Sequence, residues 1–220
     1  MRGSSDHLES TRLDGRSAAI HPRWEWRICE PAPSRLIERV SPRDAASEVS
    51  QEIYLLSIAS PHNVKVRNGQ LDVKLLEASA AGGLELWMPV FKHVFPVARR
   101  ELSAVWGAWA LCPARAGRPS YTLAQFIDEV VAREPAIHAV HVTKSRIRFE
   151  VLGCPAEHAR ILVGETRWDT LALEHEDPSL IERAKTVFGS DLPPGTNYPA
   201  MLKRAVGISV TPTLSLGASI

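Results

Sequence analysis

The stretch Val142-Thr143-Lys144-Ser145-Arg146-Ile147-Arg148-Phe149-Glu150 alternates charged with neutral side chains at a period of two. Successive side chains of a β-strand point to opposite faces of a sheet. The stretch therefore predicts a strand with one charged face and one mostly apolar face. Cations along one face repel each other unless water or an anion neutralises them. The charged face is thus either a hydrated outer surface or a wall that binds anions.

A second strand with this construction is expected at residues 23–28. Arg23, Glu25 and Arg27 share one face, while two tryptophans and an isoleucine share the other. Alternating aromatic and β-branched residues are typical of a strand face that packs on a core. This strand also has one face for packing and one face that carries charge.

The Asn68-Gly69 pair, between two alternating runs, predicts a β-hairpin with a two-residue turn. Both residue types tolerate positive φ, and such a turn determines the register of the strands that it joins. Arg67 should then face Gln70, and Lys65 should face Asp72. The predicted charged face of the hairpin consists of Asn63, Lys65, Arg67, Gln70, Asp72 and Lys74.

Helical spacing of apolar residues predicts helices at 34–40, 122–131, 178–188 and 198–206, and a further helix start at 41–44. Further strands are expected at 51–56, 84–90, 158–163 and 170–176, with Glu174 and Glu176 on one face of the last, and residues 96–111 are expected to contain strand. Each helix must bury an apolar stripe. If the helices pack outside a closed sheet, the apolar strand faces point outward and the charged faces line a tunnel. The predicted fold is α+β: an antiparallel, closed or nearly closed β-barrel with helices packed outside.

Charges inside such a tunnel must be paired or must bind ions. A polyphosphate with a divalent cation fits, because arginine and lysine neutralise phosphate oxygens and carboxylates suit Mg²⁺ or Mn²⁺. The candidate substrate-binding residues are Lys65, Arg67, Lys74, Lys144, Arg146 and Arg148. The candidate metal ligands are Glu25, Glu150, Glu174 and Glu176.

The order of these motifs resembles the CYTH, or triphosphate tunnel metalloenzyme, family. That family has an ExExK strand, basic strands and a late ExE strand. This chain has Arg23-x-Glu25-x-Arg27, Lys65-x-Arg67, Lys74, Lys144-x-Arg146, Glu174-x-Glu176 and a similar closing segment at 196–202. The resemblance covers residues 21–207. It implies metal-dependent hydrolysis of a triphosphate-containing substrate: inorganic triphosphate, a nucleotide or thiamine triphosphate.

The first strand departs from the family pattern. Arg23 stands where the family has the first glutamate, and Arg27 replaces the lysine. The resemblance implies catalytic roles for Glu25 and Arg27, but an arginine cannot act as a base. One alternative is therefore a non-catalytic protein that binds polyphosphate or nucleotides with a degenerate metal site. Another is a structural or interaction domain whose charged faces are hydrated.

Composition limits the remaining possibilities. The chain has 220 residues and a formal net charge of +1, which argues against bulk nucleic-acid binding. We expect one domain at 21–207, a disordered tail at 1–20 and a frayed tail at 208–220. Three distant cysteines without a CxxC pair fit a reducing cytoplasm. No apolar run approaches the roughly 18 residues that span a bilayer, so no membrane association is expected.

Overall fold

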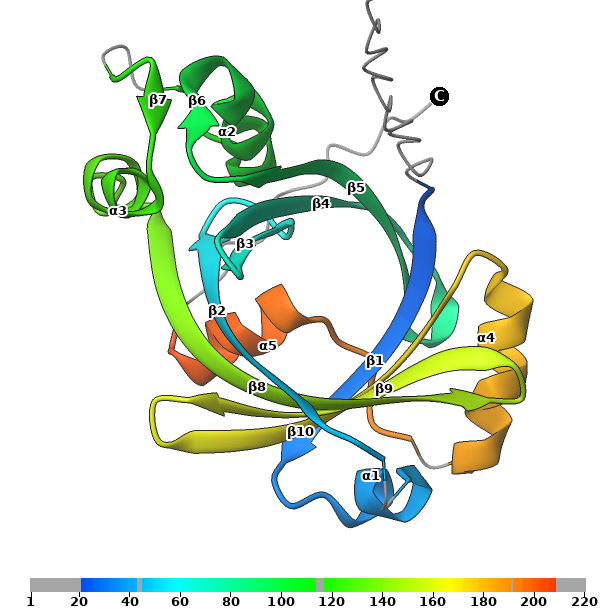
Figure 1. Ribbon diagram of the computed structural model, residues 1–220. Coiled ribbons are helices and arrows are strands. Elements are labelled where there is room, and N and C mark those ends of the chain that lie inside the picture. Colours follow the sequence, from blue (N-terminus) through cyan, green and yellow to red (C-terminus); the bar gives the residue numbers. More distant parts are fainter. Residues whose placement is uncertain (1–20, 43–44, 114–116, 191, 209–220) are drawn as a thin grey trace, which may run out of the picture.

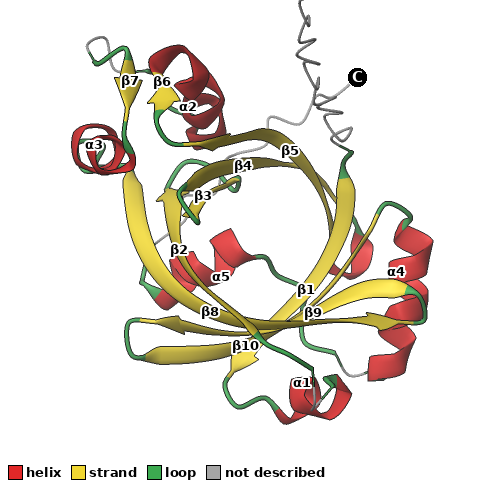
Figure 2. Cartoon of the chain, in the orientation of Figure 1, coloured by secondary structure: helices red, strands yellow, loops and turns green. Residues whose placement is uncertain are grey.

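The computed structural model describes residues 21–42, 45–113, 117–190 and 192–208 (Figures 1 and 2). The tail expected at 1–20 lies outside the described residues. So do residues 209–220 of the tail expected at 208–220, and residues 43–44 of the helix start expected at 41–44. None of the helices in the described residues is both long and apolar enough to cross a membrane.

The principal sheet is built from long strands. They are β1 (Arg23–Pro31), β2 (Glu48–Ser57), β3 (Asn63–Arg67), β4 (Gln70–Ser79), β5 (Leu84–Val94), β8 (Ile137–Val151), β9 (Cys154–Val163) and β10 (Thr166–His175). Within the described residues these eight strands close into an antiparallel barrel in the order β1-β10-β9-β8-β2-β3-β4-β5. The predicted closed barrel is confirmed.

The other elements are short. They are the paired strands β6 (Val97–Ala98) and β7 (Ser120–Tyr121), and the helices α1 (Arg35–Val40), α2 (Ser103–Trp109), α3 (Leu123–Phe126, continued by a π-helical turn, Ile127–Val131), α4 (Pro178–Lys185) and α5 (Tyr198–Ala205). Thr122 caps α3, because its Oγ1 accepts a hydrogen bond from the backbone N–H of Gln125 at 3.3 Å.

The hairpin register is confirmed. Arg67 lies opposite Gln70 and Lys65 opposite Asp72. The turn residues Asn68 and Gly69 have φ values of 51° and 69°. Only a few residue types adopt these angles without strain, so the local sequence alone determines how β3 and β4 pair.

In the described residues α1, α2, α3 and α4 cover the outer surface of the barrel, and α1, α3 and α4 were predicted to do so. The outward residues of β2, β3 and β4 form one core with α2 and α3, and those of β1, β9 and β10 form another with α1 and α4. Trp26 and Ile28 of β1, with at most 1% of their surface exposed, belong to the second core. Burying these apolar faces outward leaves the charged faces pointing into the barrel.

The prediction of strand at 96–111 is wrong. After β6, a 3-10 turn (Arg99–Leu102) leads into α2. Leu102, Val105, Trp106 and Trp109 are spaced at i, i+3, i+4 and i+7, and all four are buried. This is helical rather than strand periodicity. Trp109 also donates a hydrogen bond from Nε1 to the backbone oxygen of Leu55 at 3.1 Å, which fastens α2 to β2.

The last helix does not pack outside. Seen along the barrel in Figure 1, α5 lies within the ring of strands. Met201 and Leu202 of α5 are buried against inward-facing residues at one end of the barrel, including Leu56, Val140 and Ile161. At this end the inward faces are apolar, so an apolar helix stabilises them better than water does.

Replacing Leu202 tests this placement. Leu202 has 0% of its surface exposed, so Leu202→Ala should lower the free energy of unfolding by about 2–5 kcal/mol in denaturant titrations. Val206→Ala is the matched control, since Val206 is 41% exposed and should change stability by about 0.5 kcal/mol or less. Equal effects of the two substitutions would contradict the inward packing of α5.

Candidate functional site

A cavity of about 420 Å³ lies inside the barrel, between the strand walls and the start of α5. Among the described residues, nine cationic and four carboxylate side chains line it. The cations are Arg23, Arg27, Lys65, Arg67, Lys74, Lys92, Lys144, Arg146 and Arg148, and the carboxylates are Glu25, Asp72, Glu157 and Glu174. The structure thus brings all the predicted substrate-binding residues to one cavity.

The cations of β8 show which way the charged face points. The exposed fraction of the side chain is 63% for Arg148, 5% for Arg146 and 4% for Lys144. A hydrated outer strand face would leave all three exposed. The face therefore points inward, and the alternative of a hydrated surface is wrong for this strand.

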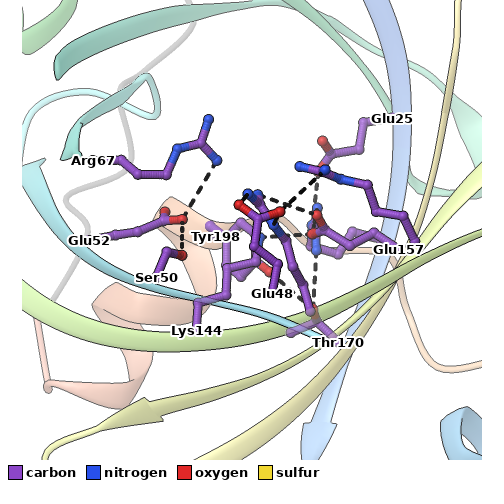
Figure 3. A network of polar contacts seen from close by, with 12 residues as sticks. Glu25, Glu48, Ser50, Glu52, Arg67, Lys144, Glu157, Thr170 and Tyr198 are labelled. Carbon is purple, nitrogen blue, oxygen red and sulfur yellow. Dashed lines mark hydrogen bonds and ion pairs between the residues drawn. The ribbon is translucent and has the colours of Figure 1, made fainter. Parts of the chain in front are cut away.

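Glu157 occupies the centre of the charged network (Figure 3). Its carboxylate accepts a hydrogen bond from Lys144 Nζ at 2.8 Å and lies 3.8 Å from the guanidinium groups of Arg27 and Arg146. Burial alone would raise the pKa of Glu157, but Lys144 and Arg27 outweigh it and lower the pKa to about 2. Three cations thus converge on one ionised carboxylate.

The sequence left Glu157 unplaced, although a signal for its position was present. Strand β9 was expected to begin at His158, whereas it begins at Cys154 after a turn in which Leu152 and Gly153 have positive φ. Counting outward from that turn places Glu157 opposite Arg148 and therefore inside the barrel. The turn was missed because leucine seldom adopts positive φ.

Tyr198, the first residue of α5, forms the floor of the cavity. The guanidinium carbon of Arg27 lies 4.0 Å from the centre of its ring and Lys144 Nζ lies 4.6 Å from it. Its hydroxyl is 3.1 Å from Thr170 Oγ1, which also accepts a hydrogen bond from Arg27. Burial raises the pKa of Tyr198, which keeps the hydroxyl neutral. The aromatic face is thus a site for cations, and the cations face the cavity.

Glu52 forms a second cluster, on β2. It pairs with Lys65 at 3.1 Å and with Arg67 at 3.8 Å, and Ser50 donates a hydrogen bond to it at 3.2 Å. Burial would raise the pKa of Glu52, but Lys65 and Lys144 lower it to about 2. Burial lowers the pKa of Lys65 to about 8 despite this partner. Sequence reasoning placed Glu52 on a strand without recognising that it faces inward.

Glu48 neutralises two cations at the open end. It accepts two hydrogen bonds from Arg146, at 3.1 Å and 2.6 Å, and lies 3.3 Å from Arg148. Because Glu48 is itself exposed, solvent screens these contacts more strongly than those of Glu157.

The predicted metal ligands are only partly brought together. Glu25 lies directly opposite Glu174 of β10 and Glu85 of β5. Glu25 instead accepts a hydrogen bond from Arg27 at 2.9 Å, and Glu85 accepts one from Asn197 at 2.8 Å. Glu174 pairs with Arg23 at 3.5 Å (an exposed contact). Each carboxylate therefore faces its own partner.

Glu150 and Glu176 are outside this group. Strand β10 ends at His175, so Glu176 leaves the barrel wall and is exposed, and the expectation that it shares a strand face with Glu174 is wrong. Glu150 is exposed near the end of β8. In the part of the chain that the structure describes, no three His, Cys, Asp or Glu side chains are grouped to hold a metal ion. The predicted donor set does not fit a resident Mg²⁺ or Mn²⁺ in this arrangement.

Comparison with known proteins gives no family assignment. No family model matches the chain, and no curated protein matches it significantly. One similar solved structure is a candidate adenylate cyclase from Bacillus halodurans, at 10% identity and a TM-score of 0.41, covering 87% of this chain and 94% of that one. Another is a candidate adenylyl cyclase from Hippeastrum described as having a dominant triphosphatase activity, at 13% identity and a TM-score of 0.41, covering 88% and 92%. Such distant likenesses carry no conclusion about activity.

Replacing Glu157 tests the central network. Glu157→Gln should lower the free energy of unfolding by about 3 kcal/mol at neutral pH, because it leaves buried cations without a partner. The pKa of Glu157 is depressed from 4.5 to about 2, so its stabilisation is present above pH 4.5 and is lost as the pH falls towards 2. The difference between wild type and variant, measured by denaturant unfolding, should therefore narrow over this range. A difference independent of pH would contradict the pairing.

Proposed function

We propose that the cavity binds a linear polyphosphate anion, such as inorganic triphosphate or the triphosphate group of a nucleotide. The observation that carries this proposal is the excess of cations inside a closed barrel. Glu48 and Glu52 do not line the cavity, but they pair with cations that do. Even when these two carboxylates are counted with the four that line the cavity, the cations outnumber the carboxylates by three. A multivalent anion would neutralise this excess.

The cations Arg67 of β3, Lys74 of β4 and Lys92 of β5 are the first candidates for contact with phosphate. Among the described residues, Lys74 and Lys92 form no ion pair, and Arg67 is only loosely paired with Glu52. Most of the cations on the other side of the cavity are engaged by Glu157 or Glu48. An anion against Lys74 and Lys92 would therefore gain contacts without first breaking an ion pair.

Hydrolysis of the bound triphosphate is a second candidate function. It is favoured by Glu25 and Glu174, which lie at opposite positions on the neighbouring strands β1 and β10 and line the same cavity. A divalent cation carried in by the triphosphate would meet these two carboxylates, whose oxygens suit Mg²⁺ and Mn²⁺. Phosphate release from tripolyphosphate, ATP and thiamine triphosphate, with and without either ion, separates a hydrolase from a protein that only binds.

Lys74 provides the most direct test of binding. Lys74→Ala should weaken tripolyphosphate binding about tenfold in calorimetric titrations, because one charge-assisted contact is lost and no ion pair is broken. The control is Arg167→Ala, which removes an exposed cation of β10 that does not line the cavity. Equal weakening by both substitutions would indicate binding to the outer surface and would contradict the proposal.

The pH dependence of binding should follow Lys65. Burial lowers the pKa of Lys65, and the nearby cations Lys144 and Arg67 lower it further. The carboxylates of Glu52 and Asp72 raise it, and the resulting pKa is about 8. At pH 9 only about a tenth of Lys65 keeps its proton, so tripolyphosphate should bind about tenfold more weakly than at pH 7.

Lys65→Arg is the matched control for this pH effect, because arginine keeps its charge over the same range. In this variant the loss of affinity between pH 7 and pH 9 should disappear. A loss of the same size in the variant would show that Lys65 is not the group that titrates.

A further inference from the structure

One end of the barrel is closed by packed apolar side chains. The inward faces of β2, β8 and β9 change from charged to apolar towards this end. These apolar residues pack on α5, and all are at most 8% exposed: Tyr54, Leu56, Val140, Val142, Ile161 and Val163 with Tyr198, Met201 and Leu202. Close packing of this kind leaves no channel for a hydrated anion.

Contacts on several sides hold α5 in this position. The Tyr198 hydroxyl meets Thr170 of β10 at 3.1 Å, and Asn197 Nδ2 donates to Glu85 of β5 at 2.8 Å. The buried Lys203 donates from Nζ to the backbone oxygen of Ser60, in the loop between β2 and β3, at 2.6 Å. Because these contacts lie on β10, on β5 and in the loop between β2 and β3, α5 is a fixed floor and not a hinged lid.

The opposite end is open and cationic. Arg23, Lys92 and Arg148 are exposed there. Along β8 the cations then become more buried, from Arg148 to Lys144 beside Tyr198. The four steps along the strand from Arg148 to Lys144 span about 13 Å, at roughly 3.3 Å per residue. The cavity is therefore deep enough for an extended chain of phosphates that enters from this end.

We infer that the cavity admits its ligand end-on and therefore selects anions with a free terminal phosphate. This inference rests on the proposed anion binding. The terminal phosphate reaches Arg27 and Lys144 next to Tyr198, while any organic group stays at the open end. Nucleoside triphosphates and the ends of linear polyphosphate satisfy this requirement. A phosphate chain blocked at both ends by nucleosides does not, since the floor gives its second nucleoside no exit.

Two adenine nucleotides of similar charge provide the test. ATP has a free terminal phosphate, whereas di(adenosine) tetraphosphate has a nucleoside at each end. Titrated against the full chain in competition with tripolyphosphate, ATP should bind about tenfold or more tightly than the blocked compound, because only its terminal phosphate can reach the buried cations. Equal affinities would overturn the inference while leaving the proposed anion binding intact. Failure of tripolyphosphate itself to bind would instead overturn the proposed function.

Long-chain polyphosphate gives an independent readout. End-on binding predicts that each chain takes up two protein molecules, one per end, whatever its length. The ratio can be measured by light scattering with polyphosphates of two defined lengths, and Arg167→Ala should leave it unchanged. A ratio that grows in proportion to chain length would show binding along the chain and would overturn the inference.

Discussion

Cations confined inside a closed barrel must be neutralised, and this constraint shapes the rest of the molecule. Removing charged groups from water costs several kcal/mol each unless partners replace the lost hydration. Glu157 is the principal partner, since Lys144, Arg27 and Arg146 all converge on it. The helices are the complement of this arrangement, because strands that turn their charges inward must bury their apolar faces against something outside.

The interior is divided into a charged half and an apolar half. On β8 the same inward face carries Val140 and Val142 before Lys144 and Arg146. The apolar half receives α5, and the charged half remains as a cavity. Tyr198 lies at the boundary, with its ring against two cations and its hydroxyl on β10. The C-terminal helix thus serves both as core and as the floor of the candidate site.

The first strand sets the chemical character of the site. Arg27 lies 2.9 Å from Glu25 and approaches Glu157, so it takes up carboxylate oxygens that could otherwise bind a metal ion. Arg23 does the same to Glu174, at 3.5 Å. Two arginines on one strand therefore favour binding of anions over assembly of a resident metal site, and the balance between binding and hydrolysis depends on this strand.

Neighbours along the chain were enough to set the alternation of β1, β3, β4 and β8 and the register at Asn68-Gly69. The spacing of apolar residues along the chain also contains the helix α2 and the apolar half of β8, although neither was predicted. The direction of the cations into the barrel, the meeting of three of them at Glu157, the floor formed by Tyr198 and the pairing of Glu25 and Glu174 with arginines depended on the tertiary structure. These contacts join residues far apart in sequence, and they arise only when β1, β8, β9 and β10 are brought together by closure of the barrel.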